Sequence, residues 1–407
     1  MANIITGLDI GSAQIKGIVT EVQKNGKLSV LAVVKQPSSG IRRGALVDQE
    51  DFTIAMRDLI ADLQKISRQA TRNIFINVQS EHIKVRNSRG MTAVARADRE
   101  IQQDDVDKAV SNARAGKAQL NFMVLHNIIR EFFVDDVGDI HDPMGMTGSR
   151  LEVSTLIVEA FTPQVDILLK SLQKAGGEIG GLIFNPLAAG RSVLTKRQRD
   201  LGTLMIDFGF GTTSFVAYEE GKVLHAKTLP IGSGLVTNDI AIGLKLPIDA
   251  AEKLKLMHGF ALAKEVSRKE TVRLNEFDPA NKSEIAQRFL AEIIEVRLAE
   301  LLELVNNELK TLGRNVQFPG GVVVTGGGVK MAGLPELTRQ ELKLAVQIGY
   351  PNLEFFEILN PAHKEMLDDP EMATVTGLAL WGHEQGGRPT LGLGPQGIKN
   401  FFKNLLP

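Results

Sequence analysis

Two segments of the sequence each place an aspartate at the end of an apolar run, directly before a glycine turn. Asp9 and Gly11 occupy these positions in the first segment, and Asp207 and Gly209 occupy them in the second. A further apolar run follows each turn, which predicts a β-hairpin. Backbone N–H groups of such turns can bind polyphosphate, and a neighbouring carboxylate suits hydrated Mg²⁺. Either turn alone indicates only a hairpin, since glycine commonly forms tight turns.

A third glycine turn, Gly326, Gly327 and Gly328, ends the apolar run that begins near residue 320. It carries no side chain that would block a flat base or a ribose, and it precedes a predicted helix whose N-terminus favours negative charge. The three turns together therefore predict a site for phosphates, a magnesium ion and a nucleoside.

The elements around these turns predict an α/β protein. Residues 51–67 have the apolar spacing of a helix opened by an acidic cap, and residues 74–79 have the composition of a strand. A polar and basic stretch from about residue 86 predicts a separate small subdomain. Residues 202–232 repeat the plan of the N-terminus, which indicates an internal repeat. Residues 283–312 have the pattern of a long amphipathic helix.

Composition excludes several classes of function. The 407 residues are enough for two or more domains, and the absence of cysteine excludes disulfides and cysteine-based zinc sites. The 47 basic and 48 acidic residues nearly cancel, so net charge gives no argument for nucleic-acid binding. No metal-ligand spacing connects the seven histidines. We expect a cytosolic chain that is neither secreted nor membrane-spanning.

The end of the sequence has the pattern of an interfacial helix. A Gly- and Pro-rich linker is predicted at 384–397, and an amphipathic helix at 398–407. The last eleven residues, 397–407, are too few to span a bilayer, so we expect this helix to form at the surface of an anionic membrane. Docking onto the protein's own groove is the alternative. The residues predicted to contact the membrane are Ile398, Phe401, Phe402, Leu405 and Leu406 on the apolar face, with Lys399 and Lys403 on the other.

Three motifs, in the right order, resemble the actin and heat-shock chaperone superfamily. The first phosphate loop matches GLDIGSAQIKG, the second matches DFGFGTTSF, and the adenosine loop matches VVVTGGGVKMAGLPEL. Within this superfamily the chain resembles the FtsA family of bacterial cell-division proteins, through GIRRGALVD, PMGMTGSRLEV, QRFLAEIIEVRLAELLELVNNEL and the terminal helix. The resemblance covers nearly the whole chain.

The resemblance implies an actin-like ATPase fold, an α/β fold of two lobes with ribonuclease-H-like cores. An FtsA-type 1C subdomain replaces the usual second actin subdomain. The subdomains implied are 1A at 1–85 and 164–195, 1C at 86–163, 2A at 196–234 and 316–383, and 2B at 235–315.

The resemblance also implies which residues hold ATP and Mg²⁺. Asp9 and Asp207 would hold Mg²⁺ through water. Glu252 and Lys255 would contact the ribose and base, and their spacing places them on one helix face. Without the motifs, a solvated surface ion pair would be the preferred interpretation of that pair. The remaining nucleotide contacts implied are Gly11, Ser12, Lys16, Gly209, Gly211, Thr212, Thr213, Gly326, Gly327, Gly328 and Lys330.

Two residues depart from the superfamily pattern. Phe210 stands where many relatives have glycine, and Ser214 stands where many have a second aspartate. Phe210 restricts the approach of the backbone to phosphate, and Ser214 cannot order Mg²⁺ or an attacking water as a carboxylate can. Losing such a group affects transition-state stabilisation more than ground-state binding. We therefore expect ATP binding with weak or no hydrolysis, and we assign no catalytic residue.

The implied partners are those of the divisome. FtsA is expected to polymerise, to bind the C-terminal tail of FtsZ through 2B, and to contact later division proteins through 1C. Arg288 and Arg297 suit acidic tail groups, although a solvated helix face is an equally good interpretation. The expected place of action is the cytoplasmic face of the cell membrane, peripherally, at the septum. The alternatives are a type IV pilus assembly adaptor, which normally lacks the terminal helix, and a soluble actin-fold ATPase or sugar kinase.

Overall fold

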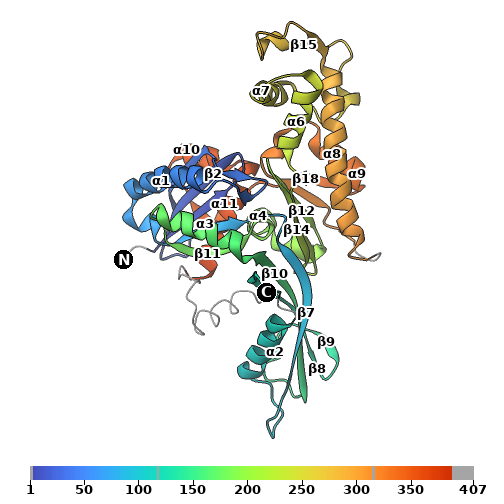
Figure 1. Cartoon of the computed structure of the whole chain (residues 1–407). Helices are drawn as coiled ribbons and strands as arrows, with labels where there is room; N and C mark the ends of the chain where they lie inside the picture. The colour runs from blue at the N-terminus through green and yellow to red at the C-terminus, as the bar shows by residue number, and fades with distance from the viewer. Residues whose placement is uncertain (1–2, 117–118, 314–316, 387–407) are drawn as a thin grey trace.

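The computed structural model describes residues 3–116, 119–313 and 317–386. The predicted terminal helix at 398–407 and nearly all of the predicted linker at 384–397 lie outside the described residues. Two lobes, each built on its own sheet, carry two smaller units that project from them (Figure 1).

The first lobe is built on a six-stranded sheet in the order β11-β6-β1-β2-β3-β19. β1 and β2 form an antiparallel hairpin, which confirms the first predicted hairpin, and β1 pairs in parallel with β6. The strands are β1 (Ile4–Ile10), β2 (Gln14–Val22), β3 (Leu28–Pro37), β6 (Ile74–Val78), β11 (Ile179–Phe184) and β19 (Phe356–Glu357).

Helices cover both faces of this sheet. On one face, α1 (Gln49–Ile66) and α3 (Thr162–Lys174) pack against each other. The predicted helix is confirmed, but it begins at Gln49, two residues before the predicted start. Its cap is Asp48, whose side chain accepts hydrogen bonds from the amides of Glu50 and Asp51. On the other face, α11 (Ala373–Glu384) contacts β1, β2 and β6. Three short elements lie at the edges, namely β4 (Ile41–Arg42), β5 (Ala45–Leu46) and α10 (Pro361–Leu367).

The second lobe repeats this plan on a five-stranded sheet in the order β14-β13-β12-β17-β18. β12 and β13 form an antiparallel hairpin and β12 pairs in parallel with β17, as β1 does with β2 and β6. The predicted internal repeat is confirmed. The elements of this lobe are α5 (Lys196–Leu201), β12 (Leu204–Phe208), β13 (Thr213–Glu219), β14 (Lys222–Leu229), β17 (Val322–Thr325), α9 (Leu334–Leu342) and β18 (Val346–Ile348).

Two helices join the lobes where their sheets meet. Helix α4 (Asn185–Val193) follows β11 of the first lobe and packs on β12 and β13 of the second. It crosses α11 at Gly377, where a β-carbon would lie 1.9 Å from the carbonyl oxygen of Ala188. The close crossing requires glycine, and it holds these two helices together where the lobes join.

The first projecting unit has its own four-stranded sheet, in the order β7-β10-β8-β9, covered by one helix. Glycine at position 90 of β7 lets this helix approach closely, since a β-carbon there would lie 2.1 Å from the carbonyl oxygen of Ala109. The predicted small subdomain at 86–163 covers most of this unit. Its elements are β7 (Lys84–Ala93), α2 (Gln103–Ala115), β8 (Phe122–Val134), β9 (Val137–Ile140) and β10 (Arg150–Phe161).

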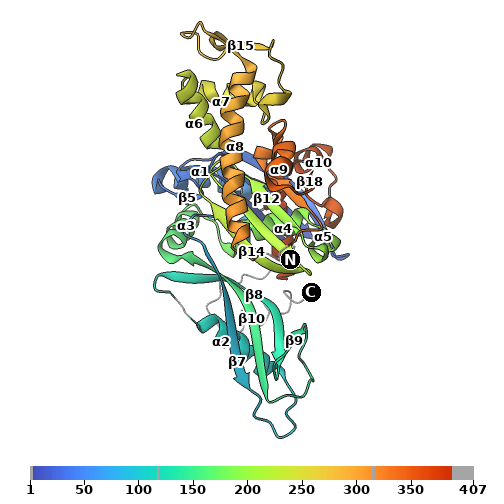
Figure 2. The same cartoon turned by 90° about the vertical axis from the view of Figure 1, so that its right-hand side faces the viewer.

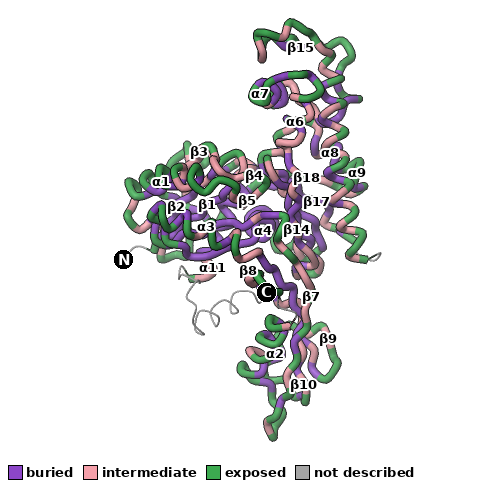
Figure 3. Tube along the Cα trace, viewed as in Figure 1, coloured by how far each residue is buried: buried purple, intermediate pink, exposed green. Residues whose placement is uncertain are grey.

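The second projecting unit is mainly helical and lies at the opposite end of the molecule (Figures 1 and 2). Its elements are α6 (Ser233–Leu244), α7 (Ile248–His258), β15 (Thr271–Arg273), β16 (Glu284–Ala286) and α8 (Gln287–Lys310). The predicted start of the last helix at residue 283 is wrong, because residues 284–286 pair with β15 instead. Buried residues concentrate along the central sheets, whereas the outer faces of both units are largely exposed (Figure 3).

Candidate functional site

The first hairpin positions a carboxylate and an ammonium group opposite each other. Asp9 near the end of β1 and Lys16 in β2 are directly paired across the strands, and Lys16 Nζ lies 3.1 Å from Asp9 Oδ2. Burial alone would lower the pKa of Lys16. The charge of Asp9, with weaker effects from Glu371 and Asp207, outweighs burial and raises this pKa. Lys16 is therefore a fixed cation at neutral pH.

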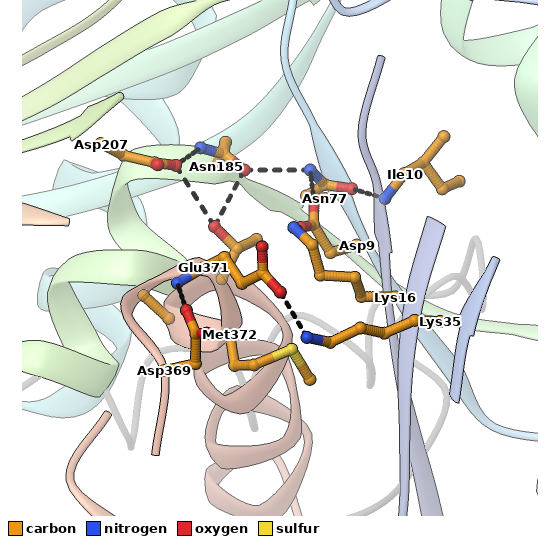
Figure 4. A network of polar contacts seen from close by, with 12 residues as sticks. Asp9, Ile10, Lys16, Lys35, Asn77, Asn185, Asp207, Asp369, Glu371 and Met372 are labelled. Carbon is orange, nitrogen blue, oxygen red and sulfur yellow. Dashed lines mark hydrogen bonds and ion pairs between the residues drawn. The ribbon is translucent and has the colours of Figure 1, made fainter. Parts of the chain in front are cut away.

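Two asparagines that the sequence analysis missed connect the aspartates of the two hairpins (Figure 4). Asn77, from the end of β6, donates through Nδ2 to Asp9 Oδ1 at 2.7 Å and to Asn185 Oδ1 at 2.9 Å. Asn185, the first residue of α4, donates through Nδ2 to Asp207 Oδ2 at 2.7 Å. The amide of Ile10 donates to Asn77 Oδ1 at 2.7 Å. The signal that the sequence offered was a polar residue inside or directly after an apolar run, in IFINV for Asn77 and after IGGLIF for Asn185.

The second aspartate is partly buried. Besides Asn185, the hydroxyl of Thr374 in α11 donates to Asp207 Oδ2 at 3.4 Å. Burial raises the pKa of Asp207, and the hydrogen bond from Asn185 opposes that shift only in part. Ser214 does not substitute for a second carboxylate, since its Oγ accepts from Asn185 Nδ2 at 2.9 Å. The centre of the site therefore contains two carboxylates held by amides.

The two predicted phosphate loops touch each other. A β-carbon on Gly211 would lie 2.4 Å from the hydroxyl oxygen of Ser12, so only glycine permits this approach. The Ser12 hydroxyl accepts a hydrogen bond from the amide of Gly44 at 3.1 Å. Thr212 Oγ1 donates to Gln79 Oε1 at 3.1 Å, again across the lobes.

The third turn packs onto the second loop. Gly326 has a φ of 88°, and a β-carbon on it would lie 2.2 Å from Asp207 Oδ1. A β-carbon on Gly328 would lie 2.8 Å from that of Phe208, whereas Gly327 has no neighbour closer than 3.8 Å. All three predicted glycine turns therefore meet at one place.

Some predicted contact residues lie differently from the expectation. Thr213 is fully buried, so its side chain is not exposed for contact with a ligand. Lys330, from the 3₁₀ helix Gly327–Lys330, lies 2.5 Å from Asp369 Oδ2 and 3.3 Å from Glu371 Oε2. Lys35 of β3 forms a further ion pair with Glu371, as Figure 4 shows. Lys330 is therefore part of an ion-pair chain that runs from the second lobe to the first.

The predicted pair Glu252 and Lys255 forms an ion pair of 2.7 Å on α7. Lys255 is only 3% exposed, so the solvated surface interpretation is wrong for this lysine. Its Nζ also donates to Thr237 Oγ1 at 2.8 Å and to the Ser233 carbonyl oxygen at 3.3 Å. Burial lowers the pKa of Lys255, and Glu252 counteracts that effect only partly.

The two arginines predicted to bind a partner have different environments on α8. Arg297 donates to both carboxylate oxygens of Asp239 on α6, at 2.5 and 3.0 Å, and to Glu300 at 2.6 Å. Arg288 has only a looser pair with Glu292 at 3.5 Å. Arg297 therefore joins α8 to α6, and Arg288 is the freer of the two cations.

No group of three or more acidic or histidine side chains converges on a possible metal site among the described residues. A magnesium ion at Asp9 and Asp207 would need water and phosphate as its other ligands, as Mg²⁺ commonly has. Within the described residues, no helix is sufficiently long and apolar to cross a membrane.

Comparison with known proteins gives two family matches. A model described as cell division protein FtsA matches residues 204–377, and one described as the SHS2 domain inserted in FtsA matches residues 80–159. The chain is 32% identical to cell division protein FtsA of Pseudomonas aeruginosa, over 86% of this chain and 83% of that protein. It is 31% identical to that of Borreliella burgdorferi, over 94% and 92%.

Solved structures share the fold at low sequence identity. A chain of the PilM-PilN type IV pilus biogenesis complex has a TM-score of 0.67 and 20% identity, covering 93% of this chain and 98% of that one. MreB5 of Spiroplasma citri bound to ADP has a TM-score of 0.55 and 11% identity, covering 93% and 95%. These matches confirm the predicted actin-like ATPase fold, and the SHS2 match identifies the inserted unit.

Proposed function

Since the chain belongs to the FtsA family of cell-division proteins, we propose that it binds Mg·ATP between its lobes, polymerises, and tethers FtsZ filaments to the cytoplasmic membrane at the septum. The observation that carries the nucleotide part is the direct contact of the two phosphate loops through Ser12 and Gly211. Two hairpin turns that meet in this way present backbone N–H groups to one polyphosphate from both lobes.

The residues present fit a magnesium nucleotide. Asp9 and Asp207 supply the carboxylates for water-mediated Mg²⁺ binding, and Lys16 supplies a cation for phosphate. Gly327 itself carries no side chain, and the nearest atom that a β-carbon there would meet is Glu371 Oε2 at 3.8 Å, so a flat base could approach its backbone. In this proposal the ribose lies towards Glu252 and Lys255. Lys330, whose side chain is half exposed beside Asp369 and Glu371, is a further proposed ligand contact.

Slow hydrolysis follows from the groups around the carboxylates. Asn77 and Asn185 are amides that cannot accept a proton from an attacking water. Ser214 carries no negative charge, and the Asp207 oxygen nearest to Asn185 already accepts two hydrogen bonds. Binding requires fewer of these groups than phosphoryl transfer does. We therefore propose that nucleotide occupancy, more than turnover, controls assembly.

Titration calorimetry with Mg·ATP tests the nucleotide proposal. Wild-type protein is expected to bind, and Asp9→Asn and Asp207→Asn are each expected to weaken Mg·ATP at least tenfold, because each removes a charge facing the metal. Asp58→Asn is the matched control, since Asp58 is exposed on α1. Absence of binding by the wild-type protein would refute the proposal. Phosphate release is expected to be below about one per minute.

The surface of α6 and α8 supports the proposal for the FtsZ tail. These helices pack together through Asp239 and Arg297, and a β-carbon on Gly243 would lie 3.2 Å from Ile293. Beside these contacts Ile242 is 77% exposed and Val296 is 70% exposed. A peptide with apolar and acidic side chains would bury this apolar surface and form an ion pair with Arg288 of α8.

The membrane proposal rests on the sequence of residues 398–406 and on the family. The sequence predicts an amphipathic helix there with Lys399 and Lys403 on its polar face. Such a helix would bind anionic lipid weakly, and polymerisation would multiply that affinity through avidity. The two projecting units lie at opposite ends of the molecule (Figure 2), where each could contact another copy of the protein. We assign self-association to these ends, and contact with later division proteins to the unit at residues 84–161.

A further inference from the structure

The aromatic ring of Phe210 rests on the N-terminus of α6. Phe210 is 39% exposed, although it belongs to the turn of the second phosphate loop. A β-carbon on Gly234 would lie 2.9 Å from a carbon of the Phe210 ring, so glycine at 234 leaves room for this ring. No residue from 209 to 211 has a positive φ, which explains why the turn accepts phenylalanine without backbone strain.

The backbone of the same turn occupies the first amides of α6. The Gly234 amide donates to the Phe210 carbonyl oxygen at 2.8 Å, and the Ser233 amide donates to that of Gly209 at 3.0 Å. A β-carbon on Gly232 would lie 2.5 Å from the Phe210 carbonyl oxygen. The amides of Ser233 and Gly234 already donate hydrogen bonds within the protein. The start of α6 therefore cannot bind a phosphate as a helix N-terminus with free amides can.

The ring of Phe210 also faces the ammonium group of Lys255. Lys255 Nζ is 5.5 Å from the centroid of the Phe210 ring, within the range of a cation–π interaction. Three acceptors, on Ser233, Thr237 and Glu252, hold this ammonium group in place. The ring therefore forms a bridge of apolar surface from the phosphate loop to the proposed ribose contacts.

We propose that Phe210 is a specificity-determining residue that makes affinity depend on the nucleoside part of a nucleoside di- or triphosphate. This inference rests on the proposed nucleotide function. A ligand with phosphates at the turn and with its sugar near Lys255 must pass along the exposed part of the ring. The carbon face of a ribose or a base gains by displacing water from an apolar ring, whereas phosphate oxygens gain nothing there.

The test compares Phe210→Ala and Phe210→Leu with the wild type, using Mg·ATP, Mg·ADP and inorganic tripolyphosphate as ligands. Phe210→Ala should lower the affinity for ATP and for ADP by about tenfold. Phe210→Leu should lower both affinities by less than about threefold, because leucine keeps most of the apolar surface. The affinity for tripolyphosphate should stay within about twofold of the wild-type value. Phe289→Ala, at an exposed phenylalanine on α8, is the matched control.

Two results would overturn the inference. If Phe210→Ala binds ATP as tightly as the wild type or more tightly, the ring is neutral or obstructs the ligand. If the substitution lowers the affinities for tripolyphosphate and for ATP by the same factor, it has reshaped the phosphate loop and has removed no nucleoside contact. Thermal melting of each variant verifies folding. A wild-type protein that binds no ATP would instead refute the nucleotide function itself, so the two failures are distinguishable.

Discussion

A hydrogen bond of 2.9 Å from Asn77 Nδ2 to Asn185 Oδ1 joins two asparagines that are 108 positions apart in the sequence. One of them holds Asp9 and the other holds Asp207. The relay therefore couples the carboxylate of one phosphate hairpin to that of the other.

Replacing Asn77 should destabilise the fold. Asn77→Ala leaves Asp9 Oδ1, Asn185 Oδ1 and the Ile10 amide without this partner, and we expect a loss of about 2–4 kcal/mol in the free energy of unfolding. Urea unfolding measures it. The control is Asn307→Ala on the exposed face of α8, which should change stability by less than about 0.5 kcal/mol. Equal effects of the two substitutions would contradict the role given to the relay.

Asp207→Asn should stabilise the empty protein at neutral pH. The pKa of Asp207 is raised above its ordinary value of 3.8, so protonation favours the folded state. This stability is fully present below pH 3.8 and is lost as the pH rises through the raised pKa. An asparagine does not ionise, so the melting temperature of the variant should exceed that of the wild type at pH 7.

The same difference in melting temperature should shrink towards pH 4. The control Asp58→Asn should show no such dependence on pH. A variant that is less stable than the wild type by the same margin at every pH would show that burial of the Asp207 charge is not the governing effect.

Glu371→Gln should weaken the connection between the lobes. Burial acts to raise the pKa of Glu371, but Lys35, Lys330 and Lys16 lower it overall. A lowered pKa means that the carboxylate adds stability above its ordinary value of 4.5, and that this stability is lost as the pH falls through the lowered pKa. We expect a loss of about 1–3 kcal/mol at pH 7 and a smaller loss below pH 4.

Thermal unfolding at both pH values tests this expectation. Glu365→Gln is the control, because Glu365 is exposed on α10. If the two variants behave alike at pH 7, the ion-pair chain of Lys35, Glu371 and Lys330 adds nothing to stability.

The arginines of α8 should separate stability from partner binding. Arg297→Ala should lower the free energy of unfolding by about 1–2 kcal/mol, because it removes the bidentate ion pair with Asp239. Arg288→Ala should change the free energy of unfolding by less than about 0.5 kcal/mol, and it should lower the affinity for an FtsZ-tail peptide about fivefold. Fluorescence anisotropy with labelled peptide measures the second effect. Unchanged affinity in Arg288→Ala would remove this arginine from the proposed surface.

Local pattern was sufficient to predict the hairpins, the third turn and the helix face shared by Glu252 and Lys255. These features depend on spacing within a short stretch. The relay through Asn77 and Asn185 was missed because it depends on where distant strand and helix ends meet, which is settled by packing around Gly377. The placement of Lys330 was missed for the same reason, since Glu371 reaches it from a distant part of the chain.

Phe210 illustrates a different limit. The resemblance to the superfamily motif led us to expect that Phe210 replaces a glycine and restricts the approach of the backbone to phosphate. The direction of the ring could not be predicted, because it depends on Gly232 and Gly234 leaving room at the start of α6. The ring lies beside Lys255 and does not fill the contact between Ser12 and Gly211.

The most direct measurement is co-sedimentation with anionic vesicles of the full chain and of a truncation that ends at Gly397, each with Mg·ATP and an FtsZ-tail peptide. The account predicts that the full chain pellets with the vesicles and carries the peptide down, while the truncation stays in the supernatant. A full chain that remains in the supernatant, or pellets without the peptide, would contradict the proposal that this protein tethers FtsZ to the membrane.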